Sequence, residues 1–239
     1  MELPHAFRGS TPPPPPAYTW PVPRGTHHPK DDAALERRVL DILDSDDPSA
    51  NLARGAADAV WRLLQNATAS RPVPPAVLDE DVFPLCDPAS PLVSVAWTLL
   101  GAPKIHDSRR FVLTAIGSLG MTPRCVVTAV VILEAVLNVD RRVLCARSAR
   151  PLVLACCALA VKLTADAEVY TGDLFASLEH LLTGIDAKEC SSMEKKVLDL
   201  LDWRIPNDPR TYQTYARELV HIGLRPGQAF DPAAVPPMF

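Results

Sequence analysis

Two almost uninterrupted apolar segments constrain this chain more than any other feature. They are VVTAVVILEAVL at residues 126–137 and PLVLACCALAVKL at residues 151–163. Each is well short of the roughly 20 residues that a bilayer-spanning helix needs, and the first contains Glu134. A short helix that is apolar on nearly every side is stable only when other elements surround it. The pattern therefore predicts an all-α domain with these two segments at its centre, and no membrane partner.

Residues on either side of the apolar segments also show helical spacing. Apolar residues recur every three or four positions, and no run alternates as a strand would. Thr122 before Pro123 is a typical helix start, and we expect Thr171 to cap another helix. Asp186 followed by Glu189 resembles a capping box. The expected helices cover residues 108–119, 122–138, 148–164 and 171–182, a fifth from Asp186 to the break at Pro206, and a sixth from Pro209 to residue 222.

The end of the fifth helix reads LLDWRIP at residues 200–206. Because proline has no backbone N–H and disfavours helical geometry in the residue before it, we expect Pro206 to stop this helix. We expect the Trp203 ring to pack in the core and close the base of the bundle. Taken alone, Glu194, near the start of the same helix, is expected to be a solvated surface residue.

The first 107 residues divide into a tail and a helical extension. Residues 1–30 contain nine prolines, which predicts a disordered or polyproline-II tail and is also compatible with an SH3 or WW ligand. Residues 31–107 predict helices at 31–44, after Pro48 and at 91–101, with irregular structure between residues 71 and 86. Their apolar stripes, such as Leu52 to Leu63, should pack on the later helices. Residues 223–239 are expected to form a C-terminal tail.

Composition narrows the classes of function. The formal net charge is −4, and basic residues occur singly or in pairs, which argues against nucleic acid as the main partner. The six cysteines form no C-x-x-C pair, so we expect no metal and no cofactor. No nucleophile–base set or catalytic motif is apparent, so we expect no enzyme. The N-terminus lacks the apolar core of a signal peptide, and we expect a cytoplasmic or nuclear location.

Two segments resemble the cyclin box, the five-helix bundle of cyclins. LAVKLTAD at residues 159–166 is an apolar helix that ends in a lysine, and MEKKVLDLLDW at residues 193–203 is a leucine-rich helix that starts with a glutamate. Their order is similar to that of the single-box cyclins of the phosphate-signalling (P-type or U-type) group. The resemblance covers residues 108–222 and implies a cyclin-box domain there.

The resemblance implies a non-catalytic regulatory subunit that binds and activates a cyclin-dependent protein kinase through the third and fifth box helices. Ala165 stands where the family has a glutamate, which is a departure from the pattern. The role would lie in the cell cycle or in phosphate signalling. The residues that it implies for kinase binding are Lys162, Leu163, Asp166, Glu194 and Leu198.

Other interpretations stay open at the level of sequence. Taken alone, Lys162 is explained as a side chain that extends from a buried helix to water, and Glu194 as a solvated residue. The whole chain is also compatible with a helical adaptor that has a cyclin-like fold and binds a non-kinase partner. A cyclin-fold transcription factor is a further alternative, opposed by the acidic charge and the single box. A kinase activator of the neuronal type, which has the cyclin fold without the cyclin motifs, is another.

Overall fold

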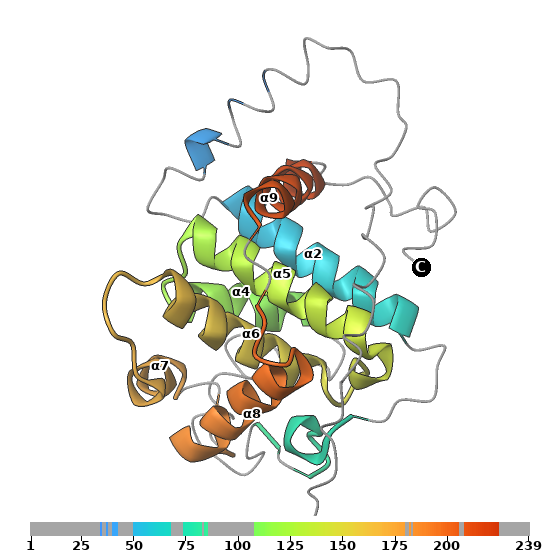
Figure 1. The fold of residues 1–239 in the computed structure, drawn as a ribbon, viewed down its shortest axis with the longest axis vertical. Helices are drawn as coiled ribbons and strands as arrows, with labels where there is room; N and C mark the ends of the chain where they lie inside the picture. Colours follow the sequence, from blue (N-terminus) through green and yellow to red (C-terminus); the bar gives the residue numbers. More distant parts are fainter. Residues whose placement is uncertain are drawn as a thin grey trace, which may run out of the picture.

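The computed structural model describes residues 34, 37, 40–42, 50–67, 74–82, 84–85, 108–179, 182, 184–205 and 208–224. Every regular element in these ranges is helical, which confirms the all-α prediction. The expected tail at residues 1–30, the helix at 91–101 and most of the helix at 31–44 lie outside the described residues. The elements are α2 (Ala50–Ala67), η1 (Ala76–Leu78), α4 (Ser108–Ser118), α5 (Pro123–Val139), η2 (Arg141–Val143), α6 (Ala149–Thr164), α7 (Thr171–Leu178), α8 (Ala187–Leu200) and α9 (Pro209–Leu224) (Figure 1).

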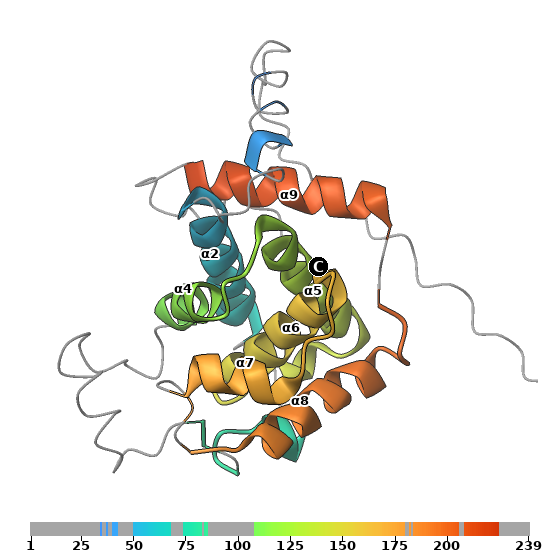
Figure 2. The ribbon, with the colours of Figure 1, turned by 90° about the vertical axis from the view of Figure 1, so that its left-hand side faces the viewer.

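Helix α6 is the central element of the fold. It packs against α5, α8 and α4, and Figure 2 shows it in the middle of the molecule, between α9 on one side and α8 on the other. From Pro151 to Ala160 every residue is buried. Each fully buried aliphatic side chain, such as Leu152, stabilises the fold by about 1.5–3 kcal/mol relative to exposure. The prediction that the two apolar segments form the centre is confirmed, because α5 is buried almost as completely.

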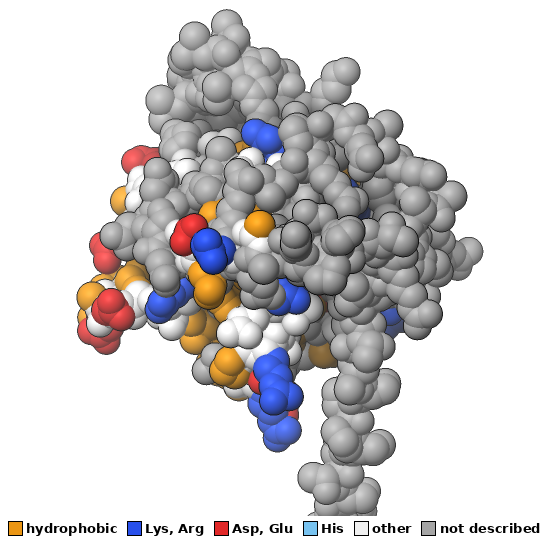
Figure 3. Space-filling model, turned by 90° about the horizontal axis from the view of Figure 1, so that it is seen from above, with side chains coloured by type: hydrophobic (Ala, Val, Ile, Leu, Met, Phe, Trp, Pro, Cys, Tyr) orange, Lys and Arg blue, Asp and Glu red, His pale blue; other side chains and the backbone are white. Residues whose placement is uncertain are grey.

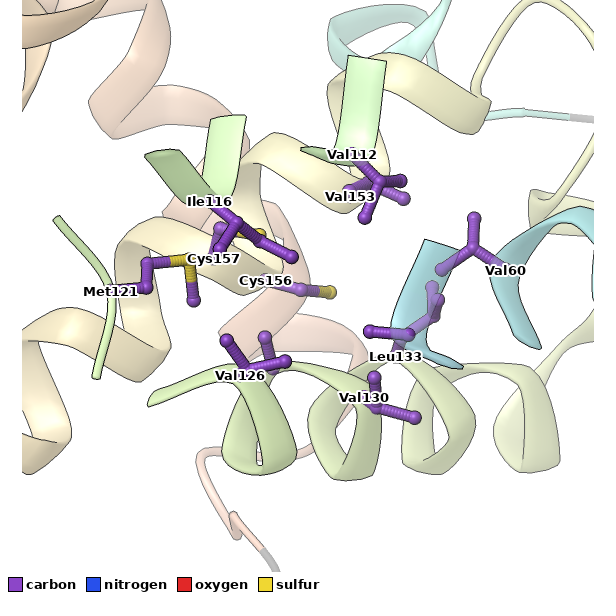
Figure 4. A pocket seen from close by; sticks show the side chains of 12 residues that line it. Val60, Val112, Ile116, Met121, Val126, Val130, Leu133, Val153, Cys156 and Cys157 are labelled. Atoms are coloured by element: carbon purple, nitrogen blue, oxygen red, sulfur yellow. The ribbon is translucent and has the colours of Figure 1, made fainter. Parts of the chain in front are cut away.

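The cysteine pair of α6 belongs to this core. Cys156 and Cys157 line a small apolar cavity of about 20 Å³ where α2, α4, α5 and α6 meet, together with Met121 and Val126 (Figure 4). Such a volume is about the size of one water molecule, and its lining offers almost no polar partner. Burial raises the pKa of Cys157 to about 12. These thiols therefore act as small hydrophobic side chains, as the sequence predicted.

Helix α2 is an integral part of the same core. It packs against α9, α4 and α5, and its stripe from Leu52 to Leu63 is buried, so the expected packing of the N-terminal helix is confirmed for α2. The closest approach between α2 and α9 occurs at two glycines. A Cβ atom at Gly55 would lie 2.8 Å from the carbonyl carbon of Leu219, and one at Gly223 would lie 2.6 Å from that of Asn51. Only glycine fits at these two positions.

Two helices, α7 and α8, differ from the sequence prediction at their ends. Helix α7 starts at Thr171 with Tyr170 as its N-cap, so Thr171 is not the cap, and it ends at Leu178 instead of residue 182. Helix α8 ends at Leu200, well before Pro206. A left-handed Asp202 (φ 51°) stops it, and the Trp203 N–H donates to the Leu198 carbonyl at 2.9 Å. This pattern is a Schellman motif.

The prediction that Trp203 closes the base of the bundle is wrong. Its side chain is 63% exposed, because the left-handed turn at Asp202 and Trp203 (φ 59°) directs the chain away before the ring can reach the core. The indole N–H donates to Asp199 Oδ1 at 3.1 Å, one helical turn earlier on α8. The ring therefore lies along the surface of its own helix.

Residues 74–82, together with 84–85, form a strap across the N-terminal end of α6. The strap contains the single turn η1 and is otherwise irregular, as expected. Glu80 forms a partly buried ion pair with Arg150, whose guanidinium also lies 5.9 Å from the centre of the Phe111 ring. Burial raises the pKa of Glu80 although Arg150 opposes the shift. The ion pair fixes the strap to α6.

Two further features of the described residues are the lengths of the helices and the charges on one face. No helix in the described ranges is both long and apolar enough to cross a membrane. On the face seen in Figure 3, the Lys and Arg side chains of the described residues are interspersed with Asp and Glu and with hydrophobic side chains. That face therefore carries no uniformly basic surface among its described side chains.

Candidate partner-binding site

The two charged residues singled out by the sequence meet in the fold. Lys162, in the last turn of α6, and Glu194, on α8, are 32 residues apart, and the distance from Lys162 Nζ to Glu194 Oε2 is 2.5 Å. Their side chains are 24% and 9% exposed. The expectation that Glu194 is a solvated surface residue is therefore wrong. Its carboxylate lies mostly buried against α6, because Lys162 reaches over it and neutralises it.

Two hydroxyl groups complete this polar cluster. Lys162 Nζ also donates to Thr171 Oγ1 at 2.5 Å, and Thr171 Oγ1 donates to Glu194 Oε1 at 3.4 Å. Ser191 Oγ donates to Thr171 Oγ1 at 3.2 Å. We call these four residues, Lys162, Thr171, Ser191 and Glu194, the Lys–Glu cluster. It joins α6, α7 and α8 at one point on the edge of the bundle.

The three other predicted site residues lie at different depths around the cluster. Leu163 is 51% exposed at the end of the core helix α6. Leu198, one turn after Glu194 on α8, is partly buried against the core. Asp166 is exposed just beyond the end of α6, and it makes no ion pair within the described part of the chain. The structure thus brings Lys162 and Glu194 together but leaves Asp166 apart from them.

A cleft opens on the other side of Leu163. Its volume is about 290 Å³, near the lower end of the range for small-molecule pockets, and Leu163, Val131, Ile205 and Tyr212 form its apolar lining. The Tyr212 hydroxyl is buried and has no hydrogen-bond partner within the described ranges. Burial raises the pKa of Tyr212 to about 12. The cleft thus joins the apolar side chain of Leu163 to a lining that also contains polar residues, among them Thr128, Asp208 and Thr211.

The acidic residue of α5 lies away from this site. Glu134 is buried where α2, α5 and α9 meet, and with Arg62 and Tyr215 it lines a small cavity of about 30 Å³. The sequence singled out Glu134 as a charge within the first apolar segment. The fold gives it a place in the interior between helices and not at the Lys–Glu cluster.

The hydrogen-bonding groups of the Lys–Glu cluster suit the binding of a partner protein. A lysine ammonium has three donors, and two are used by Glu194 and Thr171, so the third has no partner among the described residues. Beside Glu194, the thiol of Cys190 is held protonated because burial raises its pKa to about 12. No group of three or more metal-ligating side chains occurs in the described ranges. The cluster presents a fixed donor and acceptor beside an apolar surface.

Sequence reasoning missed Thr171 and Ser191. Thr171 was identified from the sequence only as a possible helix cap. Its partners on α6 and α8 lie far away in the sequence, so local spacing does not predict them. Ser191 carried no signal beyond lying three residues before Glu194 on the same helix face.

Comparison with known proteins adds no relative. No family model, no curated protein and no solved structure matches this chain.

Proposed function

We propose that this chain is a cyclin-like, non-catalytic regulatory subunit that binds and activates a cyclin-dependent protein kinase. In this proposal α4, α5, α6, α7 and α8 are the five helices of a cyclin box, with α6 as the third and α8 as the fifth. The observation that carries the proposal is the meeting of Lys162 and Glu194, from these two helices, beside the exposed Leu163.

The physical mechanism needs no chemistry from the chain itself. A protein kinase is inactive until the glutamate of its C-helix pairs with the lysine of strand β3. A rigid surface that binds the C-helix in its inward position shifts the population toward the active state. The Lys–Glu cluster is attached to the most completely buried helix of the fold, so its geometry is held by the core.

Each part of the site has a separate task in this mechanism. Leu163 and the adjoining cleft supply the apolar area that binding buries. The unused donor of Lys162 and the carboxylate of Glu194 can bond backbone groups of the kinase and fix the register of the two proteins. Loss of one member of such a buried pair at an interface costs about 2–5 kcal/mol of binding free energy.

The test is purification of the full-length tagged chain from its own cells, followed by mass spectrometry of bound proteins. The variants are the double substitution Lys162→Ala/Glu194→Ala and the single substitution Leu163→Asp. The double substitution removes both charges, so neither is left buried without its partner. Val139→Asp is the matched control, because Val139 is 60% exposed and lies at the end of α5, away from the cluster.

We expect a protein kinase to accompany the wild type and Val139→Asp, and to be lost from the double variant and from Leu163→Asp, with all four folded by circular dichroism. A kinase that binds the folded double variant as well as the wild type would refute the role of the pair. A non-kinase partner lost with Leu163→Asp would indicate the adaptor. Salt-sensitive binding to random DNA would indicate the transcription-factor alternative.

A further inference from the structure

We propose that Thr171 is a positioning residue that holds Lys162 and Glu194 in the geometry that the partner kinase recognises. This inference rests on the proposed function and extends it to a residue outside the predicted contact set. Thr171 is placed by α7, at the end of the exposed connection that follows α6. It therefore joins a third helix to the contact made by α6 and α8.

The hydrogen-bond inventory fixes the direction of each bond. A threonine hydroxyl has one donor and two acceptor sites, an ammonium group only donates, and an ionised carboxylate only accepts. Thr171 must therefore accept from Lys162 at 2.5 Å and direct its own hydrogen to Glu194 Oε1 at 3.4 Å. Its second acceptor site takes the Ser191 hydroxyl at 3.2 Å. All three sites of this one hydroxyl are in use.

This arrangement restrains both charged groups. With two donors of Lys162 directed at Glu194 Oε2 and Thr171, the direction of the third is set, because an ammonium group is tetrahedral. With Oε1 of Glu194 held by Thr171, the carboxylate cannot turn to give both of its oxygens to Lys162. Each charged group thus keeps hydrogen-bonding capacity for a partner, in a fixed direction.

The Thr171 hydroxyl forms its hydrogen bonds with the Lys–Glu cluster and does not cap its own helix. Serine and threonine at a helix start ordinarily accept from backbone N–H groups, which stabilises the helix by about 1 kcal/mol. In α7 the N-cap is Tyr170, which makes no side-chain capping bond, and Thr171 is the first helical residue. The hydroxyl is therefore available to Lys162 and Glu194, while the start of α7 goes without a side-chain cap.

The experiment uses the full-length chain and two substitutions of one residue. Thr171→Val keeps the shape of the side chain and removes the hydroxyl, whereas Thr171→Ser keeps the hydroxyl. The first measurement is the NMR signal of the Lys162 ammonium in ¹⁵N-lysine-labelled protein, visible only when its protons exchange slowly. The second is the Kd for the kinase that co-purifies with the wild type. Thermal unfolding confirms that each variant is folded.

We expect Thr171→Val to lose the ammonium signal and to bind the kinase about tenfold more weakly, the usual effect of losing one hydrogen bond to a charged group. Thr171→Ser should keep the signal and bind within about twofold of the wild type. In a Lys162→Ala background, Thr171→Val should weaken binding by less than tenfold, because only Glu194 is left for Thr171 to position.

The outcomes separate this inference from the proposed function. A kinase bound equally well by the wild type and by folded Thr171→Val overturns the positioning role and leaves the proposed function standing. An unchanged ammonium signal in Thr171→Val overturns the assigned hydrogen bonds and the positioning role with them. Absence of any kinase from the wild-type preparation overturns the proposed function itself.

Discussion

Substitution of Gly55 by alanine tests the packing of α2 on α9. The added Cβ would lie 2.8 Å from the carbonyl carbon of Leu219 and closer still to its oxygen. Carbon atoms pack at about 3.5–4.0 Å, and the oxygen overlap is larger than that of the carbon, so α9 must recede by more than roughly 1 Å. Overpacking of this kind costs about 3 kcal/mol at the upper end of its usual range. Alanine has a higher helix propensity than glycine, which stabilises α2 by about 1 kcal/mol. We therefore expect the free energy of unfolding to fall by about 2 kcal/mol.

The assay is urea unfolding followed by circular dichroism, with the free energy of unfolding taken from the linear dependence on urea. The matched control is Gly117→Ala in α4, where an added Cβ has no atom within 4 Å. At this position the higher helix propensity of alanine is not opposed by a steric overlap, so the free energy of unfolding should rise by about 0.5–1 kcal/mol. The same chemical change should therefore have opposite signs in two helices of one protein.

Two results would refute this reasoning. Equal or higher stability of Gly55→Ala would mean that α2 and α9 do not approach as described. Strict additivity of Gly55→Ala with Gly223→Ala would contradict the shared cause, because α9 has to recede only once to relieve both overlaps. We expect the double variant to lose less stability than the sum of the two single variants.

Three further predictions concern single side chains. Trp203→Ala should lower the free energy of unfolding by less than about 1 kcal/mol in a urea titration, because the indole is mostly exposed. Burial raises the pKa of Cys157 from 9.0 to about 12, so its stabilising effect is complete below pH 9 and is lost as the pH rises toward 12. Cys157→Ala should therefore lose stability less steeply above pH 9, by about 1.4 kcal/mol per pH unit. Arg150→Met leaves Glu80 buried without its partner and should cost about 3 kcal/mol at pH 7. Because burial raises the pKa of Glu80, the carboxyl protonates in the folded variant above the ordinary value of 4.5. This loss should therefore shrink as the pH falls from 7 toward 4.5 and change no further below 4.5, which unfolding curves across that pH range will show.

Features set by neighbouring residues could be predicted from the sequence. Thr122 caps α5 by accepting from the Cys125 N–H, and Asp186 with Glu189 forms a complete capping box at the start of α8. The burial of α5 and α6 followed from their composition, because a helix without a polar face has no stable place at a surface. Such features depend on residues within one helical turn of each other.

Features set by the path of the chain could not be predicted. Asp202 ends α8 in a left-handed conformation that glycine usually adopts, so nothing local signalled that Trp203 would leave the core. Pro206 was the stronger sequence signal for the end of this helix, but it lies several residues beyond Leu200, where α8 ends. The role of Thr171 depends on partners on α6 and α8, and the buried position of Glu194 depends on how these two helices meet.

The antiparallel contact of α2 and α9 has a mechanical consequence. Asn51 lies against Gly223, and Gly55 against Leu219, so the start of α2 and the end of α9 lie side by side. A force applied between these two points does not shear the pair along its length. It opens the pair from that end, one helical turn at a time, and reaches α6 only after α9 has peeled away. The described part of the fold should thus open first at the contact between the start of α2 and the end of α9, on the side opposite α8 (Figure 2).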